Sequence, residues 1–269
     1  MIDTHVHIGG EAAGFNMNED MVLCSMDKYK IDISIVSDAD AAEYAEGIGK
    51  LPEEMQASQE ETLARVIRFC RNNPGKIYGA FWCKPNYEAL NDEIEKMIAD
   101  NRDIIVALKV HPTLSNVSFS DEKMDPYLKL AEKFKLPVIV HTADDEVANP
   151  MRVYEMACRY PDLNFVMAHM GLGTDNTLAV DLMEKAPNLY ADTTWVPVET
   201  TLEVIRRYGS ERVMFGSDNP IDGLDTYSCN PKGEPCIYRQ YFGGLKEIIS
   251  QTDYENLVQN TARRIFGIK

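Results

Sequence analysis

The sequence predicts a (β/α)8 barrel, and three observations indicate this fold class. The chain has 269 residues, close to the roughly 250 that this barrel typically needs. Short runs rich in Val, Ile and aromatic residues alternate with longer amphipathic stretches. Most of the short runs are almost continuously apolar, as parallel strands covered on both faces are. We expect one barrel domain over residues 1–269. A doubly wound open sheet is the alternative, but no glycine-rich dinucleotide loop supports it.

Eight apolar runs fit the strands of such a barrel, and helical patterns lie between them. The predicted strands are residues 2–8, 33–39, 77–83, 105–111, 137–142, 164–170, 189–194 and 213–218. The predicted helices are residues 56–73, 86–101, 121–135, 150–160, 175–186 and 198–208, with a closing helix over 254–269. Helix-start signals at Ser120-Asp121-Glu122 and Asn149-Pro150, and a helix-end signal at Asn73-Pro74-Gly75, support these limits.

Two segments do not fit the regular alternation. Residues 40–55 form an extra acidic loop or helix before the third strand. Residues 219–238 follow the eighth strand, are rich in Asn, Pro, Asp and Gly, and form the longest insertion. We expect this second segment to be a lid over the C-terminal end of the barrel.

Composition and charge exclude several classes of function. The chain has 43 acidic and 27 basic residues, a net charge of −16, and no block of Lys or Arg. Phosphate binding needs clustered positive charge, so we expect no nucleic acid partner. No apolar run approaches the ~20 residues of a membrane helix, and no secretory signal is visible. We therefore expect no membrane association and a cytoplasmic location.

The six cysteines are scattered and fit free thiols in a reducing compartment. Cys229 and Cys236 share one loop, so a disulfide between them is an open alternative.

Histidines give the main functional signal. The chain has five, namely His5, His7, His111, His141 and His169. Each falls at the C-terminal end of a predicted strand, where the active sites of (β/α)8 barrels are built. Asp3, His5 and His7 are expected on one face of the first strand, because alternate residues point the same way. Two such imidazoles can hold one metal ion between them.

A carboxylate completes the candidate metal site. The eighth strand ends in Phe215-Gly216-Ser217-Asp218-Asn219-Pro220, which places Asp218 on the same rim as the histidines. Histidines from the first, fifth and sixth strands and this aspartate form a set of nitrogen and oxygen ligands. Such a set suits zinc, with manganese, iron or cobalt as alternatives.

Lys109 and His111 form a second pair, two residues apart on the fourth strand. A lysine inside a barrel strand is costly unless it is paired. Lys109 is therefore either a cation that pairs with Asp218, Asp3 or a substrate carboxylate, or a carboxylated lysine that bridges two metal ions. The expected metal count is one zinc ion, or two ions if Lys109 is carboxylated.

Seven segments, spread in order over nearly the whole length of the chain, carry a family resemblance: IDTHVHI (2–8), LKVHP (108–112), LPVIVHTA (136–143), PDLNFVMAHMG (161–171), NLYADTT (188–194), RVMFGSDNP (212–220) and QNTARRIFG (259–267). In this order they resemble the metal-dependent amidohydrolase superfamily. The similarity is to its amidohydrolase 2 branch of aminocarboxymuconate semialdehyde decarboxylase and related hydrolases and decarboxylases. The resemblance implies a TIM barrel and is specific for the superfamily, but it does not identify the substrate.

The resemblance also implies roles for individual residues. His5, His7, His141 and Asp218 would bind the metal ion, and Asp218 would also carry the proton of the activated water. His169 would be the catalytic histidine or, with two ions, a ligand of the second. Lys109 stands where two-metal members carry a carboxylated lysine, whereas Val110-His111-Pro112 resembles a subset with one or an unassigned number of ions.

We therefore predict a metal-dependent hydrolase of an amide, ester or lactone bond in a small molecule. The alternative on the same site is non-oxidative decarboxylation of an aromatic or unsaturated carboxylic acid. A metal-dependent DNase of the TatD type is a third reading, disfavoured by the net charge and by Lys109 where a glutamate is expected. A scaffold without activity is not expected, because the set of candidate ligands is complete.

Substrate contacts are expected on the strand-end loops. Lys84 and Arg152 could bind a carboxylate together with Lys109, and Trp195 could stack on a ring. The expected partner is a small-molecule substrate, and a homodimer is an assembly compatible with these observations.

Overall fold

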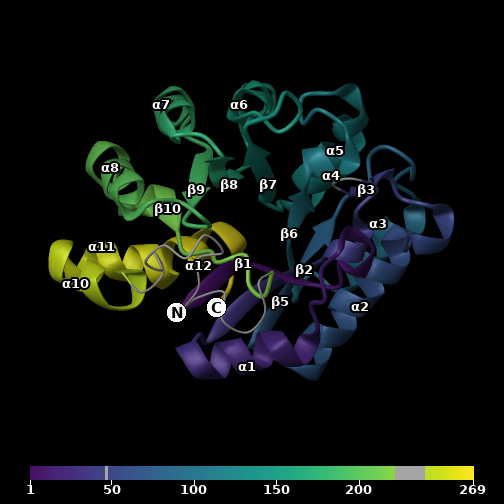
Figure 1. Cartoon of the computed structure of the whole chain (residues 1–269), viewed down its shortest axis with the longest axis horizontal. Helices are drawn as coiled ribbons and strands as arrows, with labels where there is room; N and C mark the ends of the chain where they lie inside the picture. The colour runs from purple at the N-terminus through teal and green to yellow at the C-terminus, as the bar shows by residue number, and fades with distance from the viewer. Residues whose placement is uncertain (46–47, 222–239) are drawn as a thin grey trace.

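The computed structural model describes residues 1–45, 48–221 and 240–269. In these residues, eight parallel strands pair in the order β1-β2-β5-β6-β7-β8-β9-β10, and helices lie outside them (Figure 1). The strands are β1 (Ile2–Ile8), β2 (Ile33–Asp38), β5 (Ile77–Trp82), β6 (Ile105–Val110), β7 (Val138–Ala143), β8 (Phe165–Leu172), β9 (Leu189–Asp192) and β10 (Val213–Met214). The predicted (β/α)8 barrel is confirmed, and seven of the eight predicted strands agree with the structure to within two residues.

The barrel closes between β1 and the residues that follow β10. The Asp218 amide donates to the His5 carbonyl at 2.8 Å, and the His7 amide donates to the Asn219 carbonyl at 2.9 Å. These bonds place the first strand beside the last segment of the barrel. Asp218 therefore meets the two histidines of β1 at the C-terminal end.

Strand β10 is shorter than the predicted strand over 213–218, because the residues after Met214 have other partners. The Phe215 amide donates to the Leu257 carbonyl at 2.8 Å. The Asp3 carboxylate accepts hydrogen bonds from the amide and the hydroxyl of Ser217, at 3.1 and 2.5 Å. These contacts replace the bonds of a regular ladder.

All six helices predicted between strands are present, although most are shorter than expected. They are α2 (Gln59–Asn72), α3 (Asp92–Asp100), α5 (Asp125–Phe134), α6 (Pro150–Arg159), α7 (Thr177–Lys185) and α8 (Val198–Tyr208). The predicted start of α6 is confirmed, since the Asn149 side chain accepts a hydrogen bond from the Met151 amide at 2.9 Å. Helix α1 (Glu19–Tyr29) was not predicted from the sequence. Its buried residues are Val22, Ser25 and Met26, so only two apolar side chains mark its buried face and the helical pattern in the sequence is weak.

The C-terminal segment closes the other end of the barrel. The predicted helix over 254–269 is divided into α11 (Gln251–Glu255), a π-helical turn (Asn256–Asn260) and α12 (Thr261–Phe266). A further short helix, α10 (Leu245–Ile248), precedes them. Ile265 and Phe266 pack with Ile2, Val106 and Val166 in an apolar cluster that includes residues of every barrel strand. Because apolar side chains fill this end, the polar groups inside the barrel gather at the opposite, C-terminal end.

Residues 40–55 contain a small hairpin rather than a single loop or helix. Strands β3 (Tyr44–Ala45) and β4 (Gly49–Lys50) pair only with each other, between short 3-10 helices over Ala39–Ala41 and Glu53–Met55. Leu51 is completely buried and belongs to a separate apolar cluster with Ala12, Ala42 and Ala45. The hairpin is thus an added layer at the C-terminal end of the barrel.

A buried carboxylate anchors this hairpin. Glu43 is completely buried, and its carboxylate accepts hydrogen bonds from the amides of Tyr87 at 2.6 Å and Asn86 at 3.3 Å. Its own amide donates to the Leu114 carbonyl at 2.9 Å. Burial raises the pKa of Glu43 to about 7, although the two amide donors oppose the shift.

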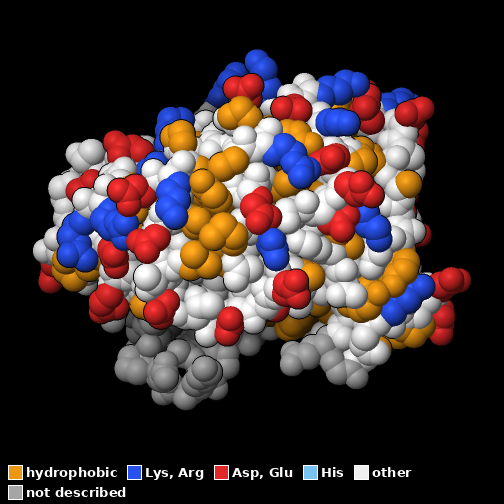
Figure 2. Space-filling view, turned by 90° about the horizontal axis from the view of Figure 1, so that it is seen from above, with side chains coloured by type: hydrophobic (Ala, Val, Ile, Leu, Met, Phe, Trp, Pro, Cys, Tyr) orange, Lys and Arg blue, Asp and Glu red, His pale blue; other side chains and the backbone are white. Residues whose placement is uncertain are grey.

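The predicted lid over 219–238 falls almost entirely outside the described residues, as do Cys229 and Cys236. On the face seen in Figure 2, acidic and basic side chains are interspersed, with hydrophobic side chains between them. Among the described helices, none combines the length and the hydrophobicity that a bilayer crossing requires.

Replacement of Glu43 with Gln tests the anchor. Because the pKa of Glu43 is raised on folding, the folded protein binds this proton more tightly than the unfolded chain between about pH 4.5 and 7. The stability that Glu43 contributes is therefore present below pH 4.5 and is lost as the pH rises through 7. From pH 5 to pH 8, the free energy of unfolding of Glu43→Gln should rise relative to the wild type by about 1 to 3 kcal/mol.

Urea denaturation at several pH values measures this difference. Glu53→Gln, an exposed change in the same segment, is the control and should follow the wild type throughout. A difference between Glu43→Gln and wild type that stays constant from pH 5 to pH 8 would contradict the prediction.

Candidate metal centre

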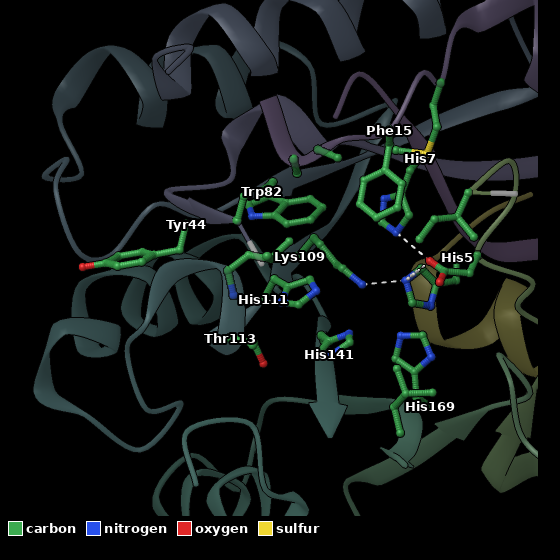
Figure 3. A pocket seen from close by; sticks show the side chains of 18 of the residues that line it. His5, His7, Phe15, Tyr44, Trp82, Lys109, His111, Thr113, His141 and His169 are labelled. Atoms are coloured by element: carbon green, nitrogen blue, oxygen red, sulfur yellow. Dashed lines mark hydrogen bonds and ion pairs between the residues drawn. The ribbon is translucent and has the colours of Figure 1, made fainter. Parts of the chain in front are cut away.

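A cavity of about 660 Å³ lies at the C-terminal end of the barrel, and all five histidines line it (Figure 3). His5 and His7 come from β1, His141 from β7 and His169 from β8, while His111 follows β6 directly. Lys109 and Asp218 line the same cavity. The prediction that the strand-end histidines meet at one rim is confirmed.

Three imidazoles and one carboxylate converge within this cavity. His5, His169 and Asp218 each offer a ligand atom, and these atoms lie within 4.8 Å of one another. Nε2 of His7 lies 3.0 Å from Oδ1 of Asp218, and Nε2 of His5 lies 3.4 Å from the same oxygen. The Nε2 atoms of both β1 histidines therefore face one carboxylate oxygen.

Buried polar groups hold the other ring nitrogen of each β1 histidine. Nδ1 of His5 lies 2.9 Å from Oδ2 of Asp192, and Nδ1 of His7 lies 2.9 Å from Oγ of Ser37. When Nδ1–H of His5 donates a hydrogen bond to the carboxylate, the lone pair lies on Nε2, where a metal ion can bind. Asp192 is itself fixed, because it accepts hydrogen bonds from the His169 amide and the Thr194 amide.

Asp3 does not belong to the cavity, which corrects the prediction that it shares a face with His5 and His7. The register of β1 against β2 is irregular between Asp3 and Val6, so the simple alternation of faces is broken there. The Asp3 carboxylate binds Ser217 instead.

Burial favours the neutral form of the five histidine rings. Desolvation lowers the pKa of all five rings, and it lowers the pKa of His169 to about 4. Neutral imidazole is the form that binds metal ions. The cavity therefore offers its nitrogen lone pairs near neutral pH.

Asp218 is held as an anion. Burial alone would raise its pKa, but His5 and His7 hold that pKa well below its usual range. Oδ2 of Asp218 accepts a hydrogen bond from the indole N–H of Trp195 at 3.0 Å. The backbone of Asp218 is left-handed, with φ of 66°, which turns the side chain out of the strand direction.

These residues fit a divalent metal ion. Nδ1 of His169 is buried and has no hydrogen-bond partner in the described part of the chain, which is uncommon for a buried polar atom. The set of three histidines and one carboxylate matches the ligands that zinc and other divalent transition metals prefer.

Lys109 is a buried cation beside this set. Its Nζ lies 2.6 Å from Nε2 of His5 and 5.8 Å from the centre of the Trp82 ring. Burial lowers the pKa of Lys109 to about 8, and Asp218 and Asp192 oppose the shift. The side chain therefore remains mostly protonated at pH 7.

His111 forms part of a column of rings. Its ring stacks on His141 with centroids 3.7 Å apart and on Trp82 with centroids 5.6 Å apart, each pair inclined by 13°. Its Nδ1 accepts a hydrogen bond from the Leu114 amide at 3.2 Å. The ring of His141 lies 4.6 Å from that of His169. The role of His141 as a metal ligand remains a prediction, as does a contact of Lys109 or His111 with a second metal ion or with the substrate.

The three predicted substrate contacts are not among the described residues that line the cavity. The amine of Lys84 is buried and donates to the Ala57 carbonyl at 2.6 Å. Arg152 pairs with Glu155 on the surface of α6. Trp195 contacts Asp218 rather than the cavity. Their role in substrate binding remains a prediction, and these contacts do not support it.

Sequence reasoning missed Ser37 and Asp192. Both lie at the C-terminal end of a predicted strand, which is the signal that could have identified them. Asp192 stands in the segment NLYADTT, beside the histidine strands on the same rim.

A protein-family model described as Amidohydrolase matches residues 2–268. No curated protein sequence matches the chain. Among solved structures, 5-carboxyvanillate decarboxylase from Sphingomonas paucimobilis is 15% identical, with a TM-score of 0.72 over 100% of this chain and 99% of that one.

Two further structures are similar over nearly the full length. One is 5-carboxyvanillate decarboxylase from Novosphingobium aromaticivorans with manganese and 4-hydroxy-3-methoxy-5-nitrobenzoic acid; it is 12% identical, with a TM-score of 0.71 over 99% of this chain and 95% of that one. The other is 4-oxalomesaconate hydratase from Rhodopseudomonas palustris, 15% identical, with a TM-score of 0.68 over 99% and 95%. At these identities the similarity establishes the fold.

Asp192→Asn tests the support of His5. The amide retains an acceptor for the His169 and Thr194 amides but lacks the charge that holds the proton on Nδ1 of His5. We expect affinity for zinc to fall about 10- to 100-fold, measured by competition with a chromogenic chelator. Asp125→Asn is the control, because Asp125 binds Arg159 on the outer helices. Unchanged zinc affinity in a folded Asp192→Asn protein would refute this role.

Proposed function

Because the chain belongs to the amidohydrolase family of enzymes, we propose that it is a metal-dependent decarboxylase of an aromatic or unsaturated carboxylic acid. The observation that carries this proposal is Lys109, a buried cation beside the candidate metal ligands. Much of the remaining cavity wall is apolar, including Phe15, Leu114 and Ile221.

Lys109 suits the binding of a substrate carboxylate. An ammonium group forms charge-assisted hydrogen bonds with a carboxylate, and these are stronger than bonds between neutral groups. The apolar wall removes water from the bound carboxylate, which disfavours the charged acid relative to uncharged carbon dioxide. Lys109 thus binds the acid, whereas the apolar wall favours its conversion to uncharged carbon dioxide.

The reaction needs neither an oxidant nor a reductant. The bond between the carboxylate carbon and the neighbouring ring or vinyl carbon breaks, and its electron pair stays on the ring or vinyl carbon. This carbon takes one proton, and carbon dioxide leaves. We assign the proton to Nζ of Lys109, which lies where the carboxylate is bound and regains a proton from solvent afterwards.

His5, His7, His169 and Asp218 are the residues that would hold the metal ion, with His141 next to them. When bound, the ion acts as a Lewis acid toward an oxygen of the substrate. Zinc is the ion expected from the ligands, and manganese is the alternative, because a structurally similar decarboxylase contains it. The similar decarboxylases support the proposed reaction type by analogy of fold.

Asp218 favours a second candidate, hydrolysis of an amide, ester or lactone, which is the main expectation from the sequence. Its carboxylate is held as an anion next to the candidate ligands. It can accept a proton from a water molecule at Oδ1 and return it to the leaving group. If the reaction is hydrolysis, Lys109 binds a carboxylate of the substrate that takes no part in the bond cleavage.

Carbon dioxide release separates the two candidates. Protein loaded with zinc or manganese should release carbon dioxide from at least one member of a panel of hydroxybenzoic and unsaturated acids. Removal of the metal by a chelator should abolish the release, and addition of the metal should restore it. If the same protein cleaves amides, esters or lactones but releases no carbon dioxide from any acid, the decarboxylase proposal is wrong and hydrolysis replaces it.

Lys109→Met tests the role of the cation. Loss of a hydrogen bond to a charged group costs about 1.5 to 3 kcal/mol, so kcat/KM should fall at least about 10-fold. The fall should be larger if Lys109 also donates the proton to the substrate carbon, because methionine cannot donate one. Metal content should stay unchanged, because Lys109 acts here as a cation and not as a carboxylated metal ligand. Lys50→Met, an exposed change on β4, is the control and should retain activity. Near wild-type decarboxylation by Lys109→Met would exclude the assigned role.

A further inference from the structure

The cavity is larger than a single aromatic ring requires. Its volume is about 660 Å³, whereas a cavity of about 150 Å³ holds a benzene ring. Figure 3 shows His5 and His169 at one end and Tyr44 at the opposite end, with Trp82 and His111 between them. A ring acid placed at Lys109 therefore leaves the part toward Tyr44 unfilled.

The wall of the cavity near Tyr44 is mainly apolar, although the side chain of Asn116 is also part of the lining there. Ala13, Tyr44, Ala45 and Leu114 line this part, and we name these four residues the distal wall. Ala45 lies in the buried cluster around Leu51, against which Ala13 and Leu114 also pack. The hairpin thus supplies a packed surface at the end of the cavity that faces away from the candidate metal ligands.

Two polar groups at this end already have partners within the protein. The hydroxyl of Tyr44 forms a hydrogen bond with the hydroxyl of Tyr87. The hydroxyl of Thr113 donates to the Asp145 carboxylate at 2.6 Å. A ligand group that reaches the distal wall therefore gains mainly from burial of apolar surface.

Aromatic rings line the path between the two ends. Trp82, His111 and His141 form the column of stacked rings described above, and all three line the cavity. A planar group packs well against such ring faces and edges. An aromatic or conjugated extension fits this path.

We propose that the substrate is a carboxylic acid with an apolar extension beyond its first ring or double bond, and that the distal wall sets the length of acid that the protein accepts. The acid end rests on the proposed function. The extension rests on the cavity and on the hairpin, which form no part of the candidate metal centre.

Two probes of different length test the proposal by isothermal titration calorimetry on the metal-loaded protein. Benzoate has one ring, and biphenyl-4-carboxylate adds a second ring in line with the first. The wild type should bind biphenyl-4-carboxylate at least 10-fold more tightly than benzoate. In Ala45→Phe, where the new ring fills the space at the distal wall, the two-ring acid should bind at least 10-fold more weakly than in wild type, and benzoate within 2-fold.

Ala13→Phe narrows the same end from the partly exposed segment after β1 and serves as a second variant if Ala45→Phe does not fold. Ala64→Phe, an exposed position on α2, is the matched control and should bind both acids as the wild type does. Three results would overturn the proposal: no preference for the two-ring acid in wild type, equal weakening of both acids in the folded distal-wall variants, or the same loss in Ala64→Phe.

The binding experiment does not depend on turnover. If the length preference and its loss in the variants are observed but no carbon dioxide is released, the decarboxylase proposal fails while the distal wall stands. If carbon dioxide is released without any length preference, the distal wall fails and the proposed reaction stands.

Discussion

Closure of the barrel is the constraint on which the candidate metal centre depends. The bonds from the Asp218 amide to His5 and from the His7 amide to Asn219 hold the first strand against a segment near the other end of the chain. They bring the aspartate and both histidines of β1 together, although the aspartate no longer belongs to a regular strand. The two hydrogen bonds from Ser217 to the Asp3 carboxylate also join the first strand to the segment after β10. The contacts that stabilise the closed barrel therefore also set the positions of the candidate metal ligands.

Much of this arrangement was predictable because it depends on local patterns. Apolar runs identify the strands, and parallel strands of a barrel all end on one face, so His141 and His169 had to lie on the same rim. The contact between His5 and Asp192 was not predictable in this way. Strands β1 and β9 are not neighbours in the sheet, and the depth at which their side chains meet depends on the shear of the whole barrel.

Other failures have different physical causes. The alternation of faces along β1 is interrupted by an irregular register. Asp3 therefore binds Ser217 and does not face the cavity, although it lies two residues before His5, just as His5 lies two residues before His7. Long side chains are a further source of error, because the position of the backbone does not determine where the charge ends. Lys84 is the second residue after β5, but its amine donates to the Ala57 carbonyl, and the residue is not among those that line the cavity.

In the described residues, strands β3 and β4 pair as strands with each other alone and add no rung to the barrel sheet. Insertions and deletions in such a segment can accumulate during evolution without disturbing the strand ladder or the barrel closure. One end of the cavity is therefore tied to the register of eight strands, while the other end is built from a module that can be exchanged. Divergence among proteins with this barrel could change what they accept by altering the hairpin alone, with the chemistry at the strand ends inherited intact.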